Sequence, residues 1–414
     1  MPEANWAGTY VYAAEAVHRP ASLDELRRIV ARAPQVRVLG SRHAFTGIGD
    51  AAELVSLERL PATIDVDRVA GTVTFGAALR LGELAAALDA ERLALHNLPS
   101  LPHVCAAGAV ATATHGSGDA LGNLATAVAG LELVTSEGEL VTAERSDDDF
   151  DGLVVGLGAL GAVTRLELDV EPAYEVRQRV FEGLEWDALL EHLDAIFASG
   201  QSVSVFTRWR DDVDQVWVKS RVTDEPEDVR DELFGARPAT VERHPILGLD
   251  PVNCTAQLGV PGPWWDRLPH FRMGFTPSSG EEIQSELHVA RADARDAIAA
   301  VRALGPQISP VLQVSELRSI PADALWMSPQ HDRECIALHF TWTREPDAVR
   351  RALARVEAAL EPFAPRPHWG KLFLAEAQAL APRYERHADF VELAERLDPR
   401  GAFGNAWFER CVVG

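Results

Sequence analysis

The sequence predicts an α+β protein built from two domains. At roughly 150 residues per domain, its 414 residues are enough for two or three folding units. Hydrophobic residues make up 47% of the chain and charged residues 24%, which suits a globular core and excludes a fibrous repeat or a disordered chain. The spacing of apolar residues changes along the chain between a period of two and a period near 3.6, so both strands and helices are expected.

The first domain is assigned to residues 1–172, which contain small α and β units. Residues 81–93 have helical spacing, and residues 106–118 are almost all small residues and glycine, as expected where a backbone approaches another group closely. Glu171-Pro172-Ala173 marks the edge of this domain. Runs in which apolar and polar residues alternate predict strands at 36–40, 62–67, 71–77, 131–135, 140–143 and 163–170.

The second domain is assigned to residues 173–375. Residues 203–210 and 213–222 alternate on either side of Asp211-Asp212, which predicts a hairpin. Residues 223–251 are rich in charge and proline and are expected to form a long surface excursion. Further strands are expected at 311–320, 335–342 and 368–374, and helices at 290–304, 348–360 and 384–397.

The acidic charge balance excludes several kinds of partner. The chain has 39 basic and 62 acidic residues, a formal net charge of −23, and no basic run, so neither nucleic acid nor an anionic membrane is an expected partner. Four scattered cysteines form no CxxC pair, which argues against a zinc site and a disulfide framework. Residues 1–20 lack the apolar block of a secretory signal. We therefore expect a cytoplasmic, monomeric protein with no metal.

Lysine is rare in this chain. Only Lys219 and Lys371 are lysines among the 39 basic residues, and the others are arginines. Base composition is a sufficient reason for the bias, but it draws attention to the two lysines that remain.

One glycine motif is misleading. Residues 156–161 read Gly-Leu-Gly-Ala-Leu-Gly, and Glu182 follows at the distance of a ribose-binding acid. A dinucleotide-binding loop must open a helix, whereas residues 163–170 have the alternation of a strand. The alternative of a nicotinamide-linked polyol-binding protein rests on this motif.

Two other glycine-dense stretches are better placed for a cofactor. Residues 40–45 follow a strand, and residues 108–118 offer small side chains and many free amides. Successive backbone N–H groups in such turns can bind a pyrophosphate, although tight turns between packed strands would look the same.

Three strand-like runs carry polar side chains two residues apart. Glu316 and Arg318 share one face of their run, and His339 and Thr341 lie opposite the apolar face of the next. Lys371 shares a face with Trp369 and Phe373. Because an isolated buried charge is costly, paired acids and bases predict a common polar pocket; the alternative is an exposed sheet face with solvated charges.

These segments together resemble the flavoproteins of the vanillyl-alcohol-oxidase (VAO/PCMH) type, and among them the alditol (xylitol/sorbitol) oxidases. The likeness spans nearly the whole chain in the right order, at residues 5–8, 36–45, 101–118, 252–255, 259–264, 275–280, 339–342 and 367–371. The resemblance implies a two-domain fold in which an FAD-binding domain is completed by a C-terminal return, here residues 376–414, around a substrate-binding domain.

The resemblance also implies a set of cofactor contacts. His43 would bond covalently to the 8α-methyl group of FAD. Arg42 stands where relatives often have glycine, so a positive φ would strain it. The other expected flavin contacts are Gly40, Ser41, Arg42, Ala44, Phe45, Ser100, Cys105, Gly108, Thr112, Thr114, His115, Gly116, Val163 and His368.

The implied activity is an FAD-dependent oxidase that converts the terminal primary alcohol of a polyol to an aldose and reduces O₂ to H₂O₂. The hydroxyls would be held by Ser100, Glu316, Arg318, His339, Thr341 and Lys371, of which Glu316, Arg318, His339 and Lys371 are the expected catalytic set. Pro99 would keep a path open for oxygen, although it also suits an ordinary turn. An aldonolactone or sugar-acid oxidoreductase of the same fold with another electron acceptor remains an alternative.

Overall fold

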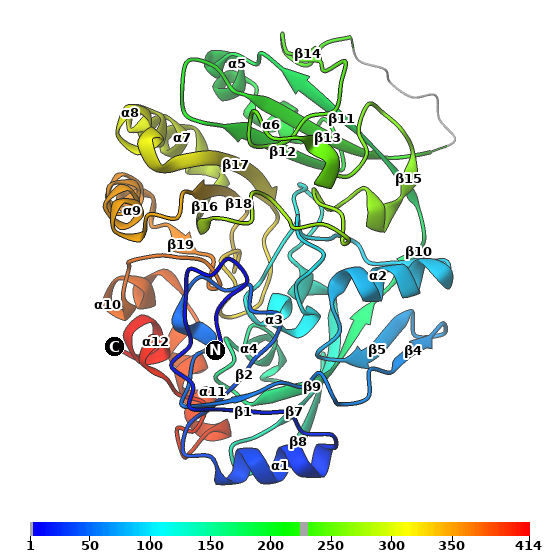
Figure 1. Ribbon diagram of the computed structural model, residues 1–414, viewed down its shortest axis with the longest axis vertical. Coiled ribbons are helices and arrows are strands. Elements are labelled where there is room, and N and C mark those ends of the chain that lie inside the picture. The colour runs from blue at the N-terminus through cyan, green and yellow to red at the C-terminus, as the bar shows by residue number, and fades with distance from the viewer. Residues whose placement is uncertain (1–2, 224–230) are drawn as a thin grey trace.

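The computed structural model describes residues 3–223 and 231–414 of the chain. Figure 1 shows two halves: the early strands lie below, and a large sheet with its helices lies above. The C-terminal helices return to the lower half, beside the N-terminal segment. The predicted α+β architecture is confirmed, while the domain boundaries at residues 172 and 375 stay predictions.

The lower half contains two main sheets. The strand orders are β1-β3-β2 and β4-β5-β9-β7-β8, and a small ladder joins β6 to β10. The strands are β1 (Ala16–His18), β2 (Val36–Val38), β3 (Glu53–Val55), β4 (Ile64–Asp67), β5 (Thr72–Gly76), β6 (Leu93–Ala94), β7 (Val128–Val134), β8 (Leu140–Glu144), β9 (Ala162–Asp169) and β10 (Glu171–Pro172). The helices are α1 (Leu23–Arg32), α2 (Leu81–Ala90), α3 (Ala106–Ala111) and α4 (Phe150–Val154).

Local sequence explains two of these elements. Helix α1 begins after Ser22, whose side chain accepts a hydrogen bond from the Glu25 amide and so caps the helix. Strand β9 begins directly after Gly161, and its residues alternate between buried and half-buried. The strand after the Gly156–Gly161 loop is therefore confirmed, and the dinucleotide-binding interpretation is wrong because no helix follows.

Among the described residues, the upper half is built on one nine-stranded antiparallel sheet. Its order is β14-β11-β13-β12-β17-β18-β16-β19, and β15 pairs with β11. The strands are β11 (Glu175–Glu182), β12 (Ser202–Thr207), β13 (Gln215–Arg221), β14 (Arg237–Pro238), β15 (Gly262–Pro263), β16 (Ile283–Ala290), β17 (Leu312–Ile320), β18 (Cys335–Trp342) and β19 (Arg366–Pro367). The predicted hairpin is β12–β13. Part of the expected surface excursion, residues 224–230, lies outside the described residues.

One face of this sheet is apolar and packs against helices. Leu317, Ile336, Leu338 and Phe340 are fully buried in one hydrophobic cluster with residues of these helices. The helices are α5 (Trp186–Glu191), α6 (Leu193–Phe197), α7 (Ala294–Ala303), α8 (Gly305–Ile308) and α9 (Pro346–Leu360). Because strand side chains alternate, the intervening residues of β17 and β18 must face the other way, toward the lower half.

The C-terminal segment packs against the lower half. Phe390 and Trp407 share a hydrophobic cluster with Leu153 of α4. The Asn405 side-chain amide donates to the carbonyl oxygens of Gly47 and Asp50, at 2.9 and 2.8 Å. The helices of this segment are α10 (Ala377–Leu380), α11 (His387–Leu397) and α12 (Ala406–Phe408).

The predicted strand at residues 368–374 is wrong. After β19 the chain turns, with the Lys371 amide donating to the His368 carbonyl at 3.0 Å. Trp369 and Phe373 pack into the hydrophobic cluster of the lower half. Because of this packing, the chain leaves the sheet after β19. Lys371 reaches the polar side of the sheet from this turn and not from a strand.

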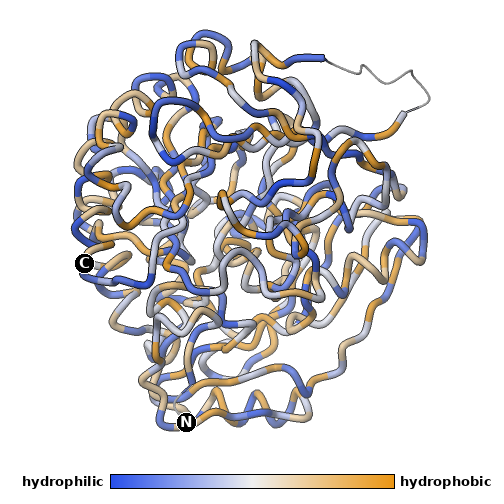
Figure 2. Tube along the Cα trace, turned by 45° about the horizontal axis from the view of Figure 1, so that its top comes forward, coloured by the Kyte–Doolittle hydropathy of each residue, from blue (hydrophilic) through white to orange (hydrophobic). Residues whose placement is uncertain are grey.

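Hydrophobic and hydrophilic residues are mixed along the trace in both halves (Figure 2). None of the helices in the described residues is long and apolar enough to span a bilayer.

Candidate active site

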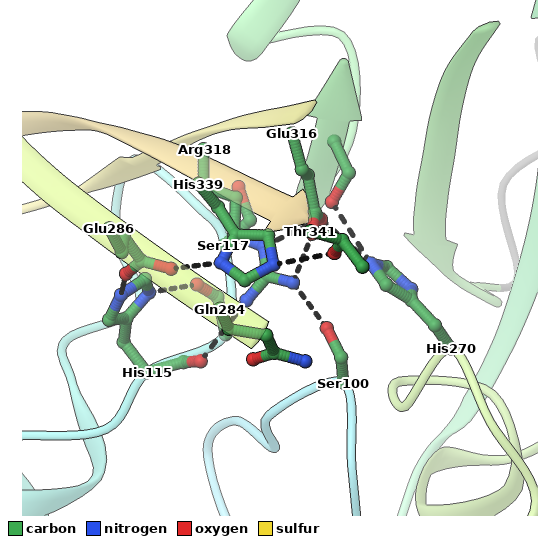
Figure 3. Close-up of polar contacts among 12 residues, drawn as sticks. Ser100, His115, Ser117, His270, Gln284, Glu286, Glu316, Arg318, His339 and Thr341 are labelled. Carbon is green, nitrogen blue, oxygen red and sulfur yellow. Dashed lines mark hydrogen bonds and ion pairs between the residues drawn. The ribbon is translucent and has the colours of Figure 1, made fainter. Parts of the chain in front are cut away.

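A cavity of about 240 Å³ is lined by loops of the lower half and by the polar face of the large sheet. All six residues predicted to hold the substrate line it: Ser100, Glu316, Arg318, His339, Thr341 and Lys371. Figure 3 shows sheet side chains pointing toward a common space, with Ser100 and His115 approaching from loops of the lower half. The prediction of a common polar pocket is therefore confirmed.

Most residues predicted to contact the cofactor also line the cavity. They come from the 40–45 loop, from the 100–115 region and from the turn after β19: Gly40, Ser41, Arg42, His43, Ala44, Phe45, Ser100, Cys105, Gly108, Thr112, Thr114, His115 and His368. The cavity thus has one wall of small residues and loops and another of charged strand residues.

Gly116 and Val163 lie outside this lining in the described part of the chain. A Cβ atom on Gly116 would lie 2.3 Å from Asn97 Oδ1 and 2.6 Å from the Leu98 carbonyl oxygen, so glycine is required there for packing. Val163 packs at the edge of two hydrophobic clusters. The cavity lends no support to a flavin contact for these two residues.

Strand register places three titratable side chains in one row. Glu316 of β17 pairs with His339 of β18, and His339 pairs with Glu286 of β16. Directly opposed residues of an antiparallel pair lie about 5 Å apart. The row therefore puts an imidazole between two buried carboxylates.

Arg318 and Glu316 form the first charged group of the site. Arg318 Nε donates to Glu316 Oε1 at 2.6 Å, and Nη2 donates both to Glu316 Oε2 and to Ser100 Oγ. Burial alone would raise the pKa of Glu316, but Arg318 and His270 hold it well below its usual value. Glu316 is thus an ionised acceptor, and Ser100 is tied to the same guanidinium.

Glu286 is the centre of the second charged group. Its side chain is fully buried, and Lys371 Nζ donates to Oε2 at 2.5 Å. His115 Nε2 lies 2.5 Å from Oε1. Burial would raise the pKa of Glu286, but Lys371 and His115 hold it well below its usual value. Glu286 is therefore the carboxylate that balances Lys371.

Sequence reasoning missed Glu286. In the run 283–290, Ile283, Leu287 and Val289 are buried in the sheet's hydrophobic cluster, while Gln284, Glu286 and His288 alternate with them. This period of two was sufficient to predict a strand with one polar face. The pairing with Lys371 was not readable, because it depends on the turn after β19.

His339 lies between these groups. Its Nδ1 is 3.0 Å from Glu286 Oε2 and 2.9 Å from Lys371 Nζ, and its Nε2 is 3.2 Å from Thr341 Oγ1. Burial, assisted by the charge of Lys371, lowers the pKa of His339 to about 4. The ring is therefore neutral near pH 7 and can accept a proton.

His43 lines the cavity from the 40–45 loop. Its ring stacks on Trp6, with 5.4 Å between ring centroids, and Nδ1 lies 3.1 Å from Ser41 Oγ. Burial, with His103 nearby, lowers the pKa of His43 to about 3, so the ring is a neutral imidazole. Next to it, Arg42 has φ = 62°, which confirms that the turn demands a left-handed residue. Arg42 also pairs with Glu3.

The residues around the cavity fit a bound FAD. A Cβ atom added at Gly49 or Gly108 would meet no atom of the described residues within 4 Å, so both glycines border open space. Arg37 also lines the cavity; it is fully buried, and its Nε and Nη2 atoms have no hydrogen-bond partner among the described residues. A buried guanidinium with free donors is suited to an anionic group such as a diphosphate.

One cluster in the site has the composition of a metal centre. His115, Glu286 and His288 bring three ligand atoms within 4.8 Å of one another. Lys371 already neutralises Glu286, and Gln330 bonds to His288 Nδ1 at 2.8 Å. The expectation of a protein without metal stays a prediction.

Comparison with known proteins identifies the group to which this fold belongs. Residues 14–144 match the model of an FAD binding domain, and residues 282–411 match that of D-arabinono-1,4-lactone oxidase. The crystal structure of a cholesterol oxidase from Brevibacterium sterolicum superposes with a TM-score of 0.79 at 14% identity, covering 99% of this chain and 96% of that one. Fold and cavity thus define an FAD-dependent oxidoreductase of the vanillyl-alcohol-oxidase type.

Two relatives of known activity indicate the family within this class of oxidoreductases. The chain is 47% identical over 415 residues to the alditol oxidase of Streptomyces sp. (strain IKD472 / FERM P-14339), with 99% of each chain covered. It is 28% identical to L-gulono-1,4-lactone dehydrogenase of Mycobacterium tuberculosis, with 99% of this chain and 98% of the relative covered. The chain belongs to the alditol oxidase family.

Strain at position 42 can be measured by comparing Arg42→Gly with Arg42→Ala. Both changes remove the ion pair with Glu3. Only the alanine variant still has a residue with a Cβ atom in the left-handed region, which costs about 1–2 kcal/mol of folding free energy. The greater flexibility of glycine in the unfolded chain offsets part of this. We expect the glycine variant to be more stable by about 0.5–1 kcal/mol in urea unfolding. A more stable alanine variant would contradict the strain.

Glu286→Gln tests the central carboxylate. The change leaves Lys371 without its buried counter-charge, and breaking such a pair costs about 3–5 kcal/mol. We expect the urea concentration at the midpoint of unfolding, followed by circular dichroism, to be clearly lower for Glu286→Gln than for the unaltered protein. The control is Asp169→Asn, which breaks a half-exposed pair with Arg145 and should cost less than about 1 kcal/mol. Equal midpoints for the two variants would show that Glu286 has no such role.

Proposed function

We propose that this protein oxidises the terminal primary alcohol of a small polyol, such as xylitol or sorbitol, to the aldose, with O₂ as the electron acceptor and H₂O₂ as the second product. The observation that carries the proposal is the row of Glu316, His339 and Glu286, of which Glu316 and His339 line the same cavity as His43. The bound FAD would take the hydride from C1 of the alcohol and pass its electrons to O₂. The protein must position the alcohol, accept the hydroxyl proton and exclude competing substrates.

Substrate binding falls to the charged pair and its neighbours. Glu316 is an acceptor for substrate hydroxyls, while Arg318, Ser100 and Thr341 offer donors. A neutral polyol satisfies both kinds of group. A substrate lacking a hydroxyl leaves a buried group unpaired, which is a strong basis for rejection. This set of contacts favours polyhydroxylated substrates over simple alcohols.

His339 is our candidate for the proton acceptor. The neutral ring has one unprotonated nitrogen, and its Nε2 lies beside Thr341 within the cavity. Lys371 and Arg318 add positive charge to the same wall. Fixed charges of this kind stabilise the negative charge that develops during reduction, by about 3 kcal/mol for each well-placed donor.

His43 is proposed as the covalent attachment point of the flavin. Its neutral ring lines the cavity and has a lone pair with which to bond the 8α-methyl carbon. Pro99 lines the cavity too, which is compatible with a role in admitting oxygen. The boundaries of the three segments, a monomeric state and a cytoplasmic location remain predictions.

A second candidate is an aldonolactone or sugar-acid oxidoreductase with another electron acceptor. It is favoured by the match to the D-arabinono-1,4-lactone oxidase model and by the L-gulono-1,4-lactone dehydrogenase relative. Peroxide formation in air, measured with xylitol and sorbitol beside a panel of aldonolactones, separates the two.

The flavin assignment is tested on the purified protein. We expect a yellow protein whose flavin is bleached by xylitol or sorbitol without air, and a denatured gel band that fluoresces under ultraviolet light. His43→Ala should lose the fluorescence of the band because the covalent bond cannot form. A protein that is colourless and cannot be reconstituted with FAD would rule out the proposed function.

The protonation state of His339 predicts how the rate of flavin reduction depends on pH on the acid side. Only the neutral ring accepts a proton, and the lowered pKa keeps the ring neutral until the pH falls to about 4. Flavin reduction measured by stopped flow should therefore change little from pH 8 to pH 5, and not halve near the ordinary histidine pKa of about 6.5. His339→Gln should slow reduction about 10²- to 10⁴-fold. An inflection near 6.5 that persists in this variant would contradict the assignment.

A further inference from the structure

The other lysine of the chain lies behind the wall that holds Glu316. Lys219 is on β13, and its side chain is 1% exposed. Its Nζ donates to the carbonyl oxygens of Leu268 and Pro269, the latter at 3.1 Å, and lies 3.0 Å from His270 Nδ1. Lys219 does not line the cavity in the described part of the chain, but His270 does.

His270 connects Lys219 to the substrate-binding carboxylate. Its Nε2 lies 2.8 Å from Glu316 Oε1, the oxygen that also accepts from Arg318 Nε. Figure 3 shows His270 on the side of Glu316 away from Glu286. The resulting chain of contacts runs from Lys219 through both ring nitrogens of His270 to Glu316.

The hydrogen-bond geometry decides the tautomer of His270. Glu316 is ionised by its two bonds from Arg318, so the nitrogen that faces it must carry the proton. Burial lowers the pKa of His270 to about 3, so the ring is neutral and Nδ1 holds a lone pair. Lys219 must then donate to Nδ1 as well as to the two carbonyls. Three acceptors match the three N–H groups of an ammonium, although burial holds the pKa of Lys219 well below its usual value.

The groups packed around His270 leave little else to fix its orientation. Ser204 Oγ of β12 lies 3.4 Å from His270 Nε2, and this distance is too long for a strong hydrogen bond. Phe206 and Trp217 present rings to the imidazole at centroid distances of 5.5 and 5.2 Å and offer no acceptor for Nδ1. Among the described residues, Lys219 is the charged group in hydrogen-bond contact with Nδ1.

We propose that Lys219 is a positioning residue for substrate binding: it holds His270 in the tautomer that donates to Glu316, so that Glu316 stays ionised and directed at the substrate hydroxyls. This inference rests on the proposed function, because it concerns the binding of the same polyol. The simpler alternative is that Lys219 only ties down the 268–270 segment through its two carbonyl contacts.

Substitutions at two positions separate these roles. Lys219→Met removes all three donated bonds. His270→Asn keeps an acceptor for Lys219 but no donor for Glu316, while His270→Gln keeps a donor near the place of Nε2. Loss of a charge-assisted hydrogen bond corresponds to roughly a tenfold change or more in binding.

We expect the KM for xylitol or sorbitol to rise about tenfold in Lys219→Met and in His270→Asn, with kcat changed less than about threefold. His270→Gln should restore most of the affinity. A merely structural lysine predicts a reduced urea midpoint in Lys219→Met with an unchanged KM, and that result would overturn the proposal. An unchanged KM in His270→Asn would overturn it as well. Because His270→Asn leaves Lys219 and its carbonyl contacts intact, a poorly folded lysine variant would not hide this second outcome.

A second measurement needs no substrate. With ¹⁵N-labelled histidine in the holoenzyme, and His270 assigned by its loss in His270→Gln, Nδ1 should give the signal of an unprotonated ring nitrogen between pH 6 and 9. Lys219→Met should shift or broaden it. An Nδ1 that is protonated in the unaltered protein would overturn the proposal even if polyols are oxidised. If polyols are not oxidised at all, the proposed function fails while the tautomer can still be read.

Discussion

The burial of two carboxylates on one sheet face governs this site. Glu286 and Glu316 are almost completely buried, and neither can remain ionised there without close cationic or hydrogen-bonding partners. Each has them: Lys371 and His115 for Glu286, Arg318 and His270 for Glu316. The partners of Glu286 come from a loop of the lower half and from the turn after β19, whereas those of Glu316 come from its own strand and from the 268–270 segment. Correct folding of both halves is thus a condition for Glu286 to be stable.

The two carboxylates leave His339 with little freedom. It pairs with Glu316 on one neighbouring strand and with Glu286 on the other, and Lys371 approaches it from a turn. Burial lowers the pKa of His339, and because the neighbouring charges already balance one another, a proton on the ring would add a buried positive charge without a carboxylate of its own. The same arrangement that stabilises the buried acids therefore keeps a neutral proton acceptor in the cavity.

Sequence periodicity predicted which residues share a face but not which faces meet. Glu316 with Arg318, and His339 with Thr341, followed from the period of two, and the structure places all four at the cavity. Glu286 was missed although its strand has the same period, and Lys371 was assigned to a strand that does not exist. Its position follows from Trp369 and Phe373, whose burial in the lower half ends the extended run. Such long-range packing leaves no local periodic signal.

The scarcity of lysine acquires a physical meaning from these contacts. Each of the two lysines ends a chain of contacts to one of the two carboxylates: Lys371 touches Glu286 directly, and Lys219 reaches Glu316 through His270. Around Lys219, two carbonyls and a ring nitrogen converge on one atom. A compact ammonium can donate to three acceptors from a single nitrogen, whereas the flat guanidinium of arginine spreads its donors in one plane and needs more room. In a chain that uses arginine almost everywhere else, the geometry of the buried position of Lys219 is thus a sufficient reason for lysine there.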